Sequence, residues 1–590
     1  MTITKGFDMR RALATMMTVA ICLAATALPA ATPADATFDA LAAKEWAYRQ
    51  DTFQSAEYSK GGTPAHLPDE SLANQKVRLD YWADVLAKLD AMPQAELSPD
   101  KREDFLVYRQ QIATLVDAQR FRDYEKPLNS DSAFWSDIAF AAQNLKRERD
   151  YVNLISLMRD IPRYFDQQIA NMKLGSKRGF TPPAAIMGGR DRGIASVAEA
   201  KSPQDTNWYV PFKTMPAGVS PERQAALRAE AVDVIGKQVI PAYAKLLGYW
   251  RSDYAPHLRK GLAAEGLPDG KAYYRAQIRA YTTLDKSPEE IHAIGLAEVA
   301  KIRGEMADIM KQVKFEGDFP AFLHFLRTDP QFYVKTPQAL LDRAAWTAKR
   351  FDAVASRWFG RNPRGRFAII KVPDDIAPFY TAGRGGQDTY LVNTYDLPSR
   401  PLFQLTALTL HESAPGHSWQ GSLAAENEDR PDYRRHTYIS AYGEGWALYC
   451  EKLGVEMGMY DTPYERFGML SYQMWRAARL VIDTGVHAKG WTREQSVAFL
   501  HDNSALSDHE IGTEVDRYIG WPGQALSYYL GELQIEAERA RAEKALGTKF
   551  DIRAFHDMIL SLGSVPLPVV TQRTDRFIAD GGKGPWKIED

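Results

Sequence analysis

The sequence predicts a mainly α-helical protein of two lobes, with a small antiparallel β-sheet in the second lobe. Helical patterns run almost without interruption from Phe38 to about Gln331, and they return in the last part of the chain as far as Leu562. Strand-like runs fall between Phe367 and Tyr395. A chain of 590 residues exceeds one compact core, which favours a division into two lobes.

The first half is predicted to be helical partly because its helix starts are marked. Three segments open with serine, then proline, then an acid: Ser98-Pro99-Asp100, Ser220-Pro221-Glu222 and Ser287-Pro288-Glu289. Serine can cap the free amides, proline suits the first helical position, and the acid complements the helix dipole. After the third start, apolar residues recur at helical spacing from Ile291 to Ile309.

The pattern changes after about residue 350. Phe367 to Val372 and Thr389 to Tyr395 are predicted strands, and the glycines of Gly383 to Gly386 predict a hairpin turn between them. A largely apolar run, Leu402 to Leu410, then leads into a histidine motif. We therefore predict an N-terminal helical lobe at residues 37–340 and a second lobe, which carries the chemistry, at residues 341–590.

The N-terminus predicts export. Three basic residues within Lys5–Arg11 precede an uncharged stretch whose strongly apolar part, Met16 to Leu28, is too short to span a bilayer comfortably. We predict a signal peptide at residues 1–36, so that the protein is periplasmic in a Gram-negative source and secreted otherwise. After cleavage no membrane attachment is expected. An uncleaved anchor is the alternative.

The two cysteines carry little chemistry. Cys22 lies in the predicted signal, so Cys450 would be the only cysteine of the mature chain and no internal disulfide is expected. Cys22 would suit a lipoprotein, but Ile21 is too large for the residue before such a cysteine. The sequence therefore favours an ordinary cleaved signal.

Composition and motifs exclude several function classes. The formal net charge is -2, so there is no basic excess to hold a phosphate backbone, and a nucleic-acid partner is not expected. The sequence contains no Gly-x-Ser-x-Gly or Gly-x-Gly-x-x-Gly motif, which leaves serine hydrolase and dinucleotide-binding functions without support.

The strongest chemical motif is His411-Glu412-Ser413-Ala414-Pro415-Gly416-His417, which resembles the HExxH signature of zincins with Pro-Gly inserted before the second histidine. On a regular helix, residues six apart differ by about 120° in direction, whereas residues four apart differ by about 40°. Pro415 lacks an amide and pushes against the carbonyl of His411, and Gly416 adds backbone freedom. We predict a bulge that brings both imidazoles to one ion.

Glu444 is the predicted third ligand. It is the only charged residue between Tyr438 and Cys450, and an unpaired buried carboxylate would cost several kcal/mol, a cost that a metal removes. Gly443 and Gly445 are expected to let its helix approach the motif helix closely. The alternative is a structural pairing of Glu444 with an arginine. The reserve candidates for the third ligand are His436, His509 and Glu514.

Two histidines and one carboxylate leave an open position on Zn²⁺ for water. Zinc lowers the pKa of that water to around 7, so Glu412 could take its proton and later pass it to a leaving amine. Glu451, seven residues after Glu444, lies on nearly the same helix face and could support a ligand. Cobalt or manganese could occupy similar ligands.

Other candidates for catalysis lie further along the chain. Arg517 and Tyr518 suggest a device that stabilises the tetrahedral oxygen or clamps a substrate carboxylate. The alternative is a surface arginine beside a core tyrosine. His509 has a similar case as a transition-state donor, and Arg573 is left outside the predicted site.

Three motifs carry a resemblance to a known family: His411 to His417, Gly443-Glu444-Gly445-Trp446-Ala447, and Arg517-Tyr518-Ile519-Gly520-Trp521-Pro522-Gly523-Gln524-Ala525. Together they resemble the bacterial domain-of-unknown-function 885 family over nearly the whole mature chain. That family has a mostly helical fold similar to gluzincin metallopeptidases. The resemblance implies a two-lobed, zincin-like fold with zinc at His411, His417 and Glu444, and with Glu412 as base.

The predicted function is therefore an exported zinc metallopeptidase that hydrolyses oligopeptides, with residues 341–590 as its catalytic, zinc-binding lobe. The strand Thr389 to Tyr395 could be an edge that pairs with an extended peptide, or else an internal strand. One alternative is a zinc hydrolase of non-peptide amides or esters. Another is a non-catalytic periplasmic binding protein that zinc only braces.

Overall fold

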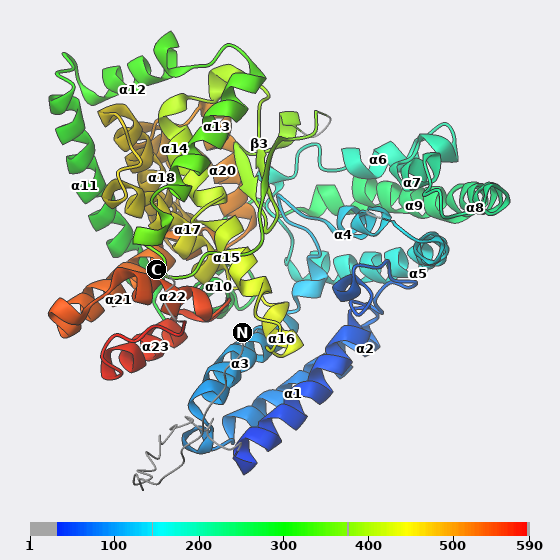
Figure 1. Ribbon diagram of the computed structural model, residues 1–590. Helices are drawn as coiled ribbons and strands as arrows, with labels where there is room; N and C mark the ends of the chain where they lie inside the picture. Colours follow the sequence, from blue (N-terminus) through cyan, green and yellow to red (C-terminus); the bar gives the residue numbers. More distant parts are fainter. Residues whose placement is uncertain (1–31, 144, 375–376, 587–590) are drawn as a thin grey trace, which may run out of the picture.

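The computed structural model describes residues 32–143, 145–374 and 377–586, and it confirms a mainly helical fold with very little strand (Figure 1). Most of the predicted signal peptide lies outside the described residues. Residues 33–36 form the first turn of α1, where the buried carboxylate of Asp35 accepts a hydrogen bond from Ser98 N at 3.0 Å. The signal boundary at residue 36 stays a prediction.

The first helices form a separate small core. They are α1 (Pro33–Thr52), α2 (Leu72–Asp90) and α3 (Pro99–Phe121). Helix α3 begins at the predicted proline, directly after Ser98. The core that they enclose contains Phe38, Trp82, Phe105 and Tyr108.

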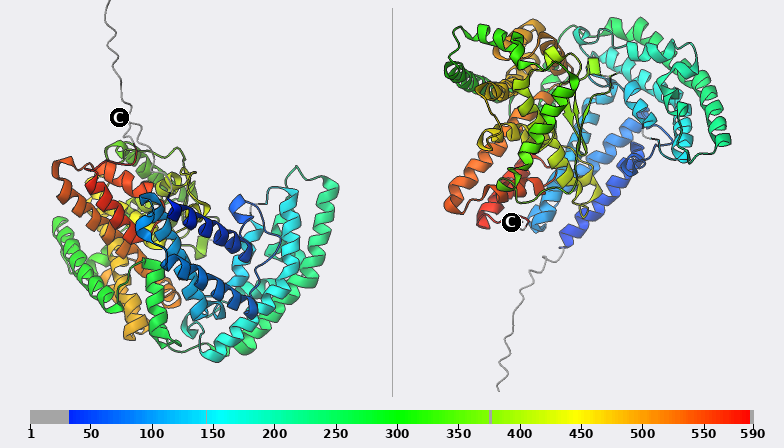
Figure 2. Two further views of the ribbon diagram at one scale, coloured as in Figure 1. Left: turned by 90° about the horizontal axis from the view of Figure 1, so that it is seen from below. Right: turned by 45° about the horizontal axis from the view of Figure 1, so that its top comes forward.

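The next group projects from the rest of the molecule as an arm (Figure 2). Its helices are α4 (Phe134–Asp137), α5 (Glu148–Arg178), α6 (Arg192–Ala198), α7 (Val210–Lys213), α8 (Pro221–Val234) and α9 (Ile240–Tyr249). A π-helical turn, Ile235–Val239, joins α8 to α9, so the two form one continuous rod.

Four helices then lead back to the main body: α10 (Gly270–Thr282), α11 (Pro288–Gln312), α12 (Phe319–Thr328) and α13 (Pro337–Asp352). Helix α11 packs along α18 (Pro463–Lys489), and one hydrophobic core includes residues from both. This packing crosses the predicted lobe boundary. The division at residues 340 and 341 stays a prediction.

The sheet is mixed, so the antiparallel prediction was wrong. Its strands are β1 (Ala368–Lys371), β2 (Gly383–Gly385) and β3 (Thr389–Val392), in the order β1-β3-β2. The chain makes a hairpin from β2 into β3, and β3 lies beside β1 in the same direction. The parallel pair results because β1 and β3 are not joined by a hairpin.

Two further expectations about the sheet need correction. Gly383 to Gly385 is a strand, and the turn lies at residues 386–388. Strand β3 is internal, and β2 is the edge strand nearest to the histidine motif. A glycine-rich stretch is read as a turn from sequence because glycine weakens strands, but here it allows a close approach to another backbone.

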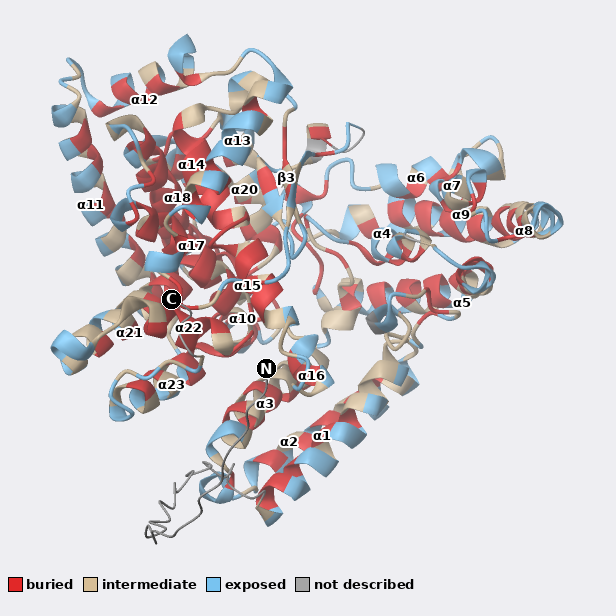
Figure 3. Cartoon of the chain, in the orientation of Figure 1, coloured by how far each residue is buried: buried red, intermediate tan, exposed pale blue. Residues whose placement is uncertain are grey.

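The remaining helices are α14 (Leu402–Glu412), α15 (His417–Ala425), α16 (Asp432–Arg435), α17 (Ser440–Glu456), α19 (Arg493–Asn503), α20 (Asp508–Gly520), α21 (Ser527–Leu546), α22 (Ile552–Ser561) and α23 (Leu567–Ala579). Helices α14, α17 and α18 lie in the buried centre of the body (Figure 3). Buried helices surrounded by protein hold their side chains rigidly, which suits a functional site. None of the helices in the described ranges has the length and apolar character that a bilayer span requires.

Candidate metal centre

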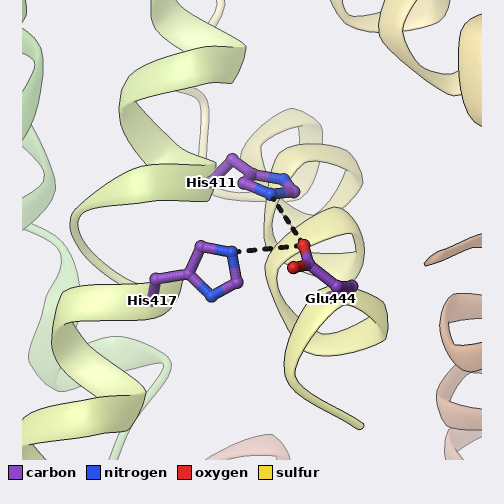
Figure 4. Close-up of side chains that lie close together, drawn as sticks. All are labelled: His411, His417 and Glu444. Atoms are coloured by element: carbon purple, nitrogen blue, oxygen red, sulfur yellow. Dashed lines mark ion pairs between the residues drawn. The ribbon is translucent and has the colours of Figure 1, made fainter. Parts of the chain in front are cut away.

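His411, His417 and Glu444 come together between three helices, α14, α15 and α17. One donor atom from each lies within 4.8 Å of the others. Oε2 of Glu444 is 3.6 Å from Nε2 of His411 and 3.3 Å from Nε2 of His417, and Figure 4 shows the three groups pointing toward one another. Nitrogen and oxygen donors of this type are the set that a catalytic zinc site uses.

The histidine motif does not form one bent helix. Helix α14 ends at Glu412, α15 begins at His417, and the four residues between them leave helical geometry. Gly416 N donates to Leu410 O at 3.0 Å, and a Cβ atom on Gly416 would lie 1.8 Å from His411 O. Because Gly416 has no side chain, its backbone can pack directly against the backbone of His411. This close packing turns His417 toward His411. The Ala414-Pro415 peptide bond is cis.

His411 is oriented from behind by Glu451. The Nδ1 atom of His411 is 2.7 Å from Oε1 of Glu451, which is fully buried on α17. This contact keeps a proton on Nδ1 and directs Nε2 toward Glu444, so that Nε2 is the atom offered to a metal. The seven-residue spacing from Glu444 predicted such a supporting role.

The charge of the cluster fits a divalent cation. Three carboxylates, Glu412, Glu444 and Glu451, surround the two imidazoles, and Arg476 approaches Glu451 at 3.8 Å. With neutral histidines, two negative charges remain uncompensated.

The two ligand types already attract each other. Burial lowers the pKa of His411, but hydrogen bonds to Glu444 and Glu451 outweigh it and raise that pKa to about 10. Burial raises the pKa of Glu444, but the neighbouring His417 and His411 hold it well below its usual value. A metal ion would displace the histidine protons from the same position.

Glu412 is held beside the triad by the sheet. Its Oε2 accepts a hydrogen bond from Gly385 N at 2.6 Å, so the edge strand β2 fixes the carboxylate. A Cβ atom on Gly385 would lie 1.9 Å from Glu412 O, so only glycine permits this approach.

Tyr438 is a site residue that the sequence reasoning missed. Its hydroxyl donates to Oε1 of Glu444 at 2.9 Å, although 63% of the residue is exposed. Enclosure of the hydroxyl by protein and the charge of Glu444 raise its pKa well above the usual value, so it stays a donor. The ring lies over Gly443, where a Cβ atom would be 2.6 Å away. The glycine beside Glu444 was the available signal.

The prediction that Gly443 and Gly445 let α17 approach the motif helix was therefore wrong. Gly443 accommodates Tyr438, and Gly445 packs against Gly531 of α21, to whose Cα its Cβ would approach within 2.5 Å. The sequence showed that small residues were needed, but it did not identify the neighbour.

Tyr518 belongs to the core, as the alternative interpretation had it. Its hydroxyl accepts hydrogen bonds from Trp475 Nε1 at 2.8 Å and Arg479 Nε at 3.0 Å, and 1% of the residue is exposed. Arg517 donates to Gln524 Oε1 at 2.9 Å and to Tyr528 at 3.2 Å. Helix α20 thus directs Tyr518 toward α18, and Arg517 toward Gln524 and α21, rather than toward the triad.

The remaining candidates have other surroundings. His509 is exposed at the start of α20, and His436 stacks on Trp46 at 6.2 Å between ring centroids. Glu514 pairs with Arg479 at 2.8 Å, and Arg573 pairs with Glu103. Within the described residues, the triad is the group whose donor atoms could hold an ion.

The motif that contains Arg517 and Tyr518 has a structural role. After α20, Gly523 turns with φ 82° and donates its amide to buried Asp483 of α18 at 3.1 Å. The Tyr274 hydroxyl of α10 donates to the same carboxylate at 2.5 Å. Asp483 thus joins three segments, and burial raises its pKa to about 7.

Replacing Asp483 with asparagine should alter the pH dependence of stability. The folded protein binds this proton more tightly than the unfolded chain, because the pKa rises from 3.8 to about 7 on folding. As the pH rises between these two values, the free energy of unfolding of the wild type should fall relative to that of D483N, by on the order of 1.4 kcal/mol per pH unit. Denaturant unfolding at pH 5 and pH 8 measures the difference, and parallel profiles would contradict the assignment.

Fold and site together define a mainly helical protein with a His-His-Glu candidate metal centre. The chain belongs to the DUF885 family, described as bacterial proteins of unknown function, whose model matches residues 55–573. No curated protein matches the sequence significantly.

Two solved structures share the fold. A candidate lipoprotein from Colwellia psychrerythraea has a TM-score of 0.84 and 24% identity, and the match covers 93% of this chain and 99% of that chain. A candidate lipoprotein of unknown function from Shewanella oneidensis has a TM-score of 0.67 and 18% identity, with 91% and 99% covered. At these identities the likeness shows the fold alone. Cys22 of this chain lies outside the described residues, and the gluzincin similarity stays a prediction.

Proposed function

We propose that this protein is an exported metallopeptidase that hydrolyses oligopeptides with zinc held by His411, His417 and Glu444. The observation that carries the proposal is the placement of these three donors within 4.8 Å of one another, with Glu412 beside them. A brace for the fold would need no base next to the first ligand and would fill its fourth position with protein.

The metal and the residues around its ligands have separate roles in the proposed reaction. Zinc bound there would supply Lewis acidity, which makes water acidic near neutral pH and polarises a carbonyl. Glu451 keeps His411 in the tautomer that offers Nε2. Glu412 is the group that takes the proton of the attacking water, and it later returns that proton to the leaving amine. The hydrogen bond from Gly385 keeps its carboxylate in position.

Tyr438 is the proposed donor to the substrate oxygen. Its hydroxyl donates to Glu444, and much of the side chain is open to a substrate, toward whose oxygen the same proton would turn during the reaction. A phenol that remains protonated can stabilise negative charge on a carbonyl oxygen in the transition state. This takes over the role that the sequence suggested for Tyr518.

Strand β2 supports peptides as the substrate class. Gly386 N and Ala382 O bond toward β3, so the intervening backbone groups of Gly383 and Gly385 alternate to the opposite side. No further strand pairs with that side among the described residues. Glu412 already accepts the hydrogen bond of the Gly385 amide, so an extended peptide can add to this edge through Gly383 and the carbonyl of Gly385. A simple ester lacks the backbone N–H groups that could pair with this strand.

Replacing Tyr438 with phenylalanine should lower kcat by about 10- to 100-fold, with little change in KM, because one transition-state hydrogen bond is lost. Zinc affinity should stay within about threefold of the wild type. Steady-state peptide hydrolysis and zinc titration measure the two effects. A large loss of zinc affinity with unchanged kcat at saturating zinc would assign Tyr438 to positioning Glu444 instead.

The proposed function is tested on the purified, zinc-loaded protein. Oligopeptides and simple esters are incubated with it, with and without chelator, and products are identified by mass spectrometry. Chelator-sensitive cleavage of peptide bonds supports the proposal. Cleavage of esters alone would favour a non-peptide hydrolase, and zinc binding without any cleavage would favour a binding protein.

A further inference from the structure

Arg384 is an unpaired cation on the strand that holds Glu412. It is exposed in the middle of β2, and no ion pair to it occurs within residues 32–143, 145–374 and 377–586. By contrast, the exposed Lys371 of β1 pairs with Asp374 at 2.7 Å. A guanidinium without a carboxylate partner is available to an incoming one.

The pleat of the sheet decides where Arg384 points. Tyr390 and Val392 of β3 are buried, whereas Leu391, which is paired with Arg384, is half-buried. Successive residues of a strand face opposite sides, so Arg384 lies on the outer face, away from the core. Gly385, one residue later, lies against Glu412 on the inner side.

This register defines a neighbour for Arg384 in the substrate. A peptide that runs antiparallel along β2, bonded to Gly383 and to the carbonyl of Gly385, places one residue directly opposite Arg384, in a non-hydrogen-bonded pair on the same outer face. Side chains are closest in such pairs. Because Gly385 bonds to Glu412, that substrate residue lies close to the bond that is cleaved.

We propose that Arg384 selects substrates with a carboxylate at the position opposite it, a specificity that rests on the proposed function. Arginine matches a carboxylate with two parallel hydrogen bonds. The carboxylate could belong to an acidic side chain or to the C-terminus of the peptide. The triad is surrounded by acids, and Arg384 is a cation on the strand that contacts Glu412, so it can attract an anionic substrate.

The test measures kcat/KM for end-blocked peptides that differ only in Glu, Gln or Lys within two residues of the cleaved bond. At one of these peptide positions, the kcat/KM of the wild type should be about threefold to fivefold higher for Glu than for Gln. An effect of this size corresponds to the energy of an exposed ion pair. R384Q should abolish this difference, and R384E should reverse the order of Glu and Lys. The preference should shrink at high salt.

The second arm compares free and amidated C-termini on otherwise identical peptides, which distinguishes a terminal carboxylate from a side chain. Lys371→Gln, on the opposite edge of the sheet, is the matched control and should leave the preference unchanged. Melting temperatures check that the exposed substitutions fold. Peptide cleavage with the same Glu-to-Lys ratio in wild type and R384E would overturn the inference and leave the proposed function standing. No cleavage of any peptide would overturn both.

Discussion

Replacing Glu412 with glutamine is expected to lower kcat/KM for peptide hydrolysis by about 1000-fold, within the range of general acid–base catalysis. The amide has nearly the same shape as the carboxylate. Its oxygen can still accept the hydrogen bond from Gly385 N, which is 2.6 Å long in the wild type. The amide cannot take a proton from water, so only the chemical step should fail.

The measurement compares E412Q with the wild type at equal zinc occupancy. E412Q should bind one equivalent of zinc and unfold near the wild-type temperature. Glu428→Gln is the matched control, because Glu428 is an exposed acid on the loop after α15. Full peptidase activity in E412Q would show that Glu412 is not the base, and the non-catalytic alternative would then gain weight.

The ligand set could be predicted from sequence because its chemistry limits the choice of residues. Two histidines beside a glutamate, and one acid in the otherwise uncharged run from Tyr438 to Cys450, leave few arrangements that avoid a buried unpaired charge. Helical periodicity then indicated Glu451. Its contact with His411 at 2.7 Å depends on the rigid geometry of α17.

The parts that sequence could not provide depend on which neighbours meet. Nothing local distinguishes Tyr518, which faces a core arginine, from Tyr438, which faces Glu444. Each follows a polar residue and lies in or next to a helix. The sheet was misread for a similar reason, because the role of Gly385 depends on the carbonyl of Glu412, 27 residues later. Tertiary contacts override local preference at such positions.

Replacing Glu444 with alanine should remove stoichiometric zinc from the protein. The variant leaves two imidazoles, and the acids beside them in the described part of the chain, Glu412 and Glu451, are bonded to Gly385 and His411. At free zinc one hundred times the wild-type Kd, zinc should stabilise the wild type by about 2.7 kcal/mol. E444A should gain almost nothing under these conditions. Metal analysis after dialysis and thermal unfolding with and without zinc measure both effects.

Glu456→Gln is the control on the same helix, because it removes a surface partner of Arg539 at 2.7 Å and should keep full zinc stabilisation. Comparing E412Q with E444A separates the chemical step from zinc binding. One should bind zinc and fail in chemistry, whereas the other should fail in binding. If E444A kept one equivalent of zinc with wild-type affinity, the ion would lie elsewhere, and neither Glu412 nor Tyr438 could act on a substrate beside it.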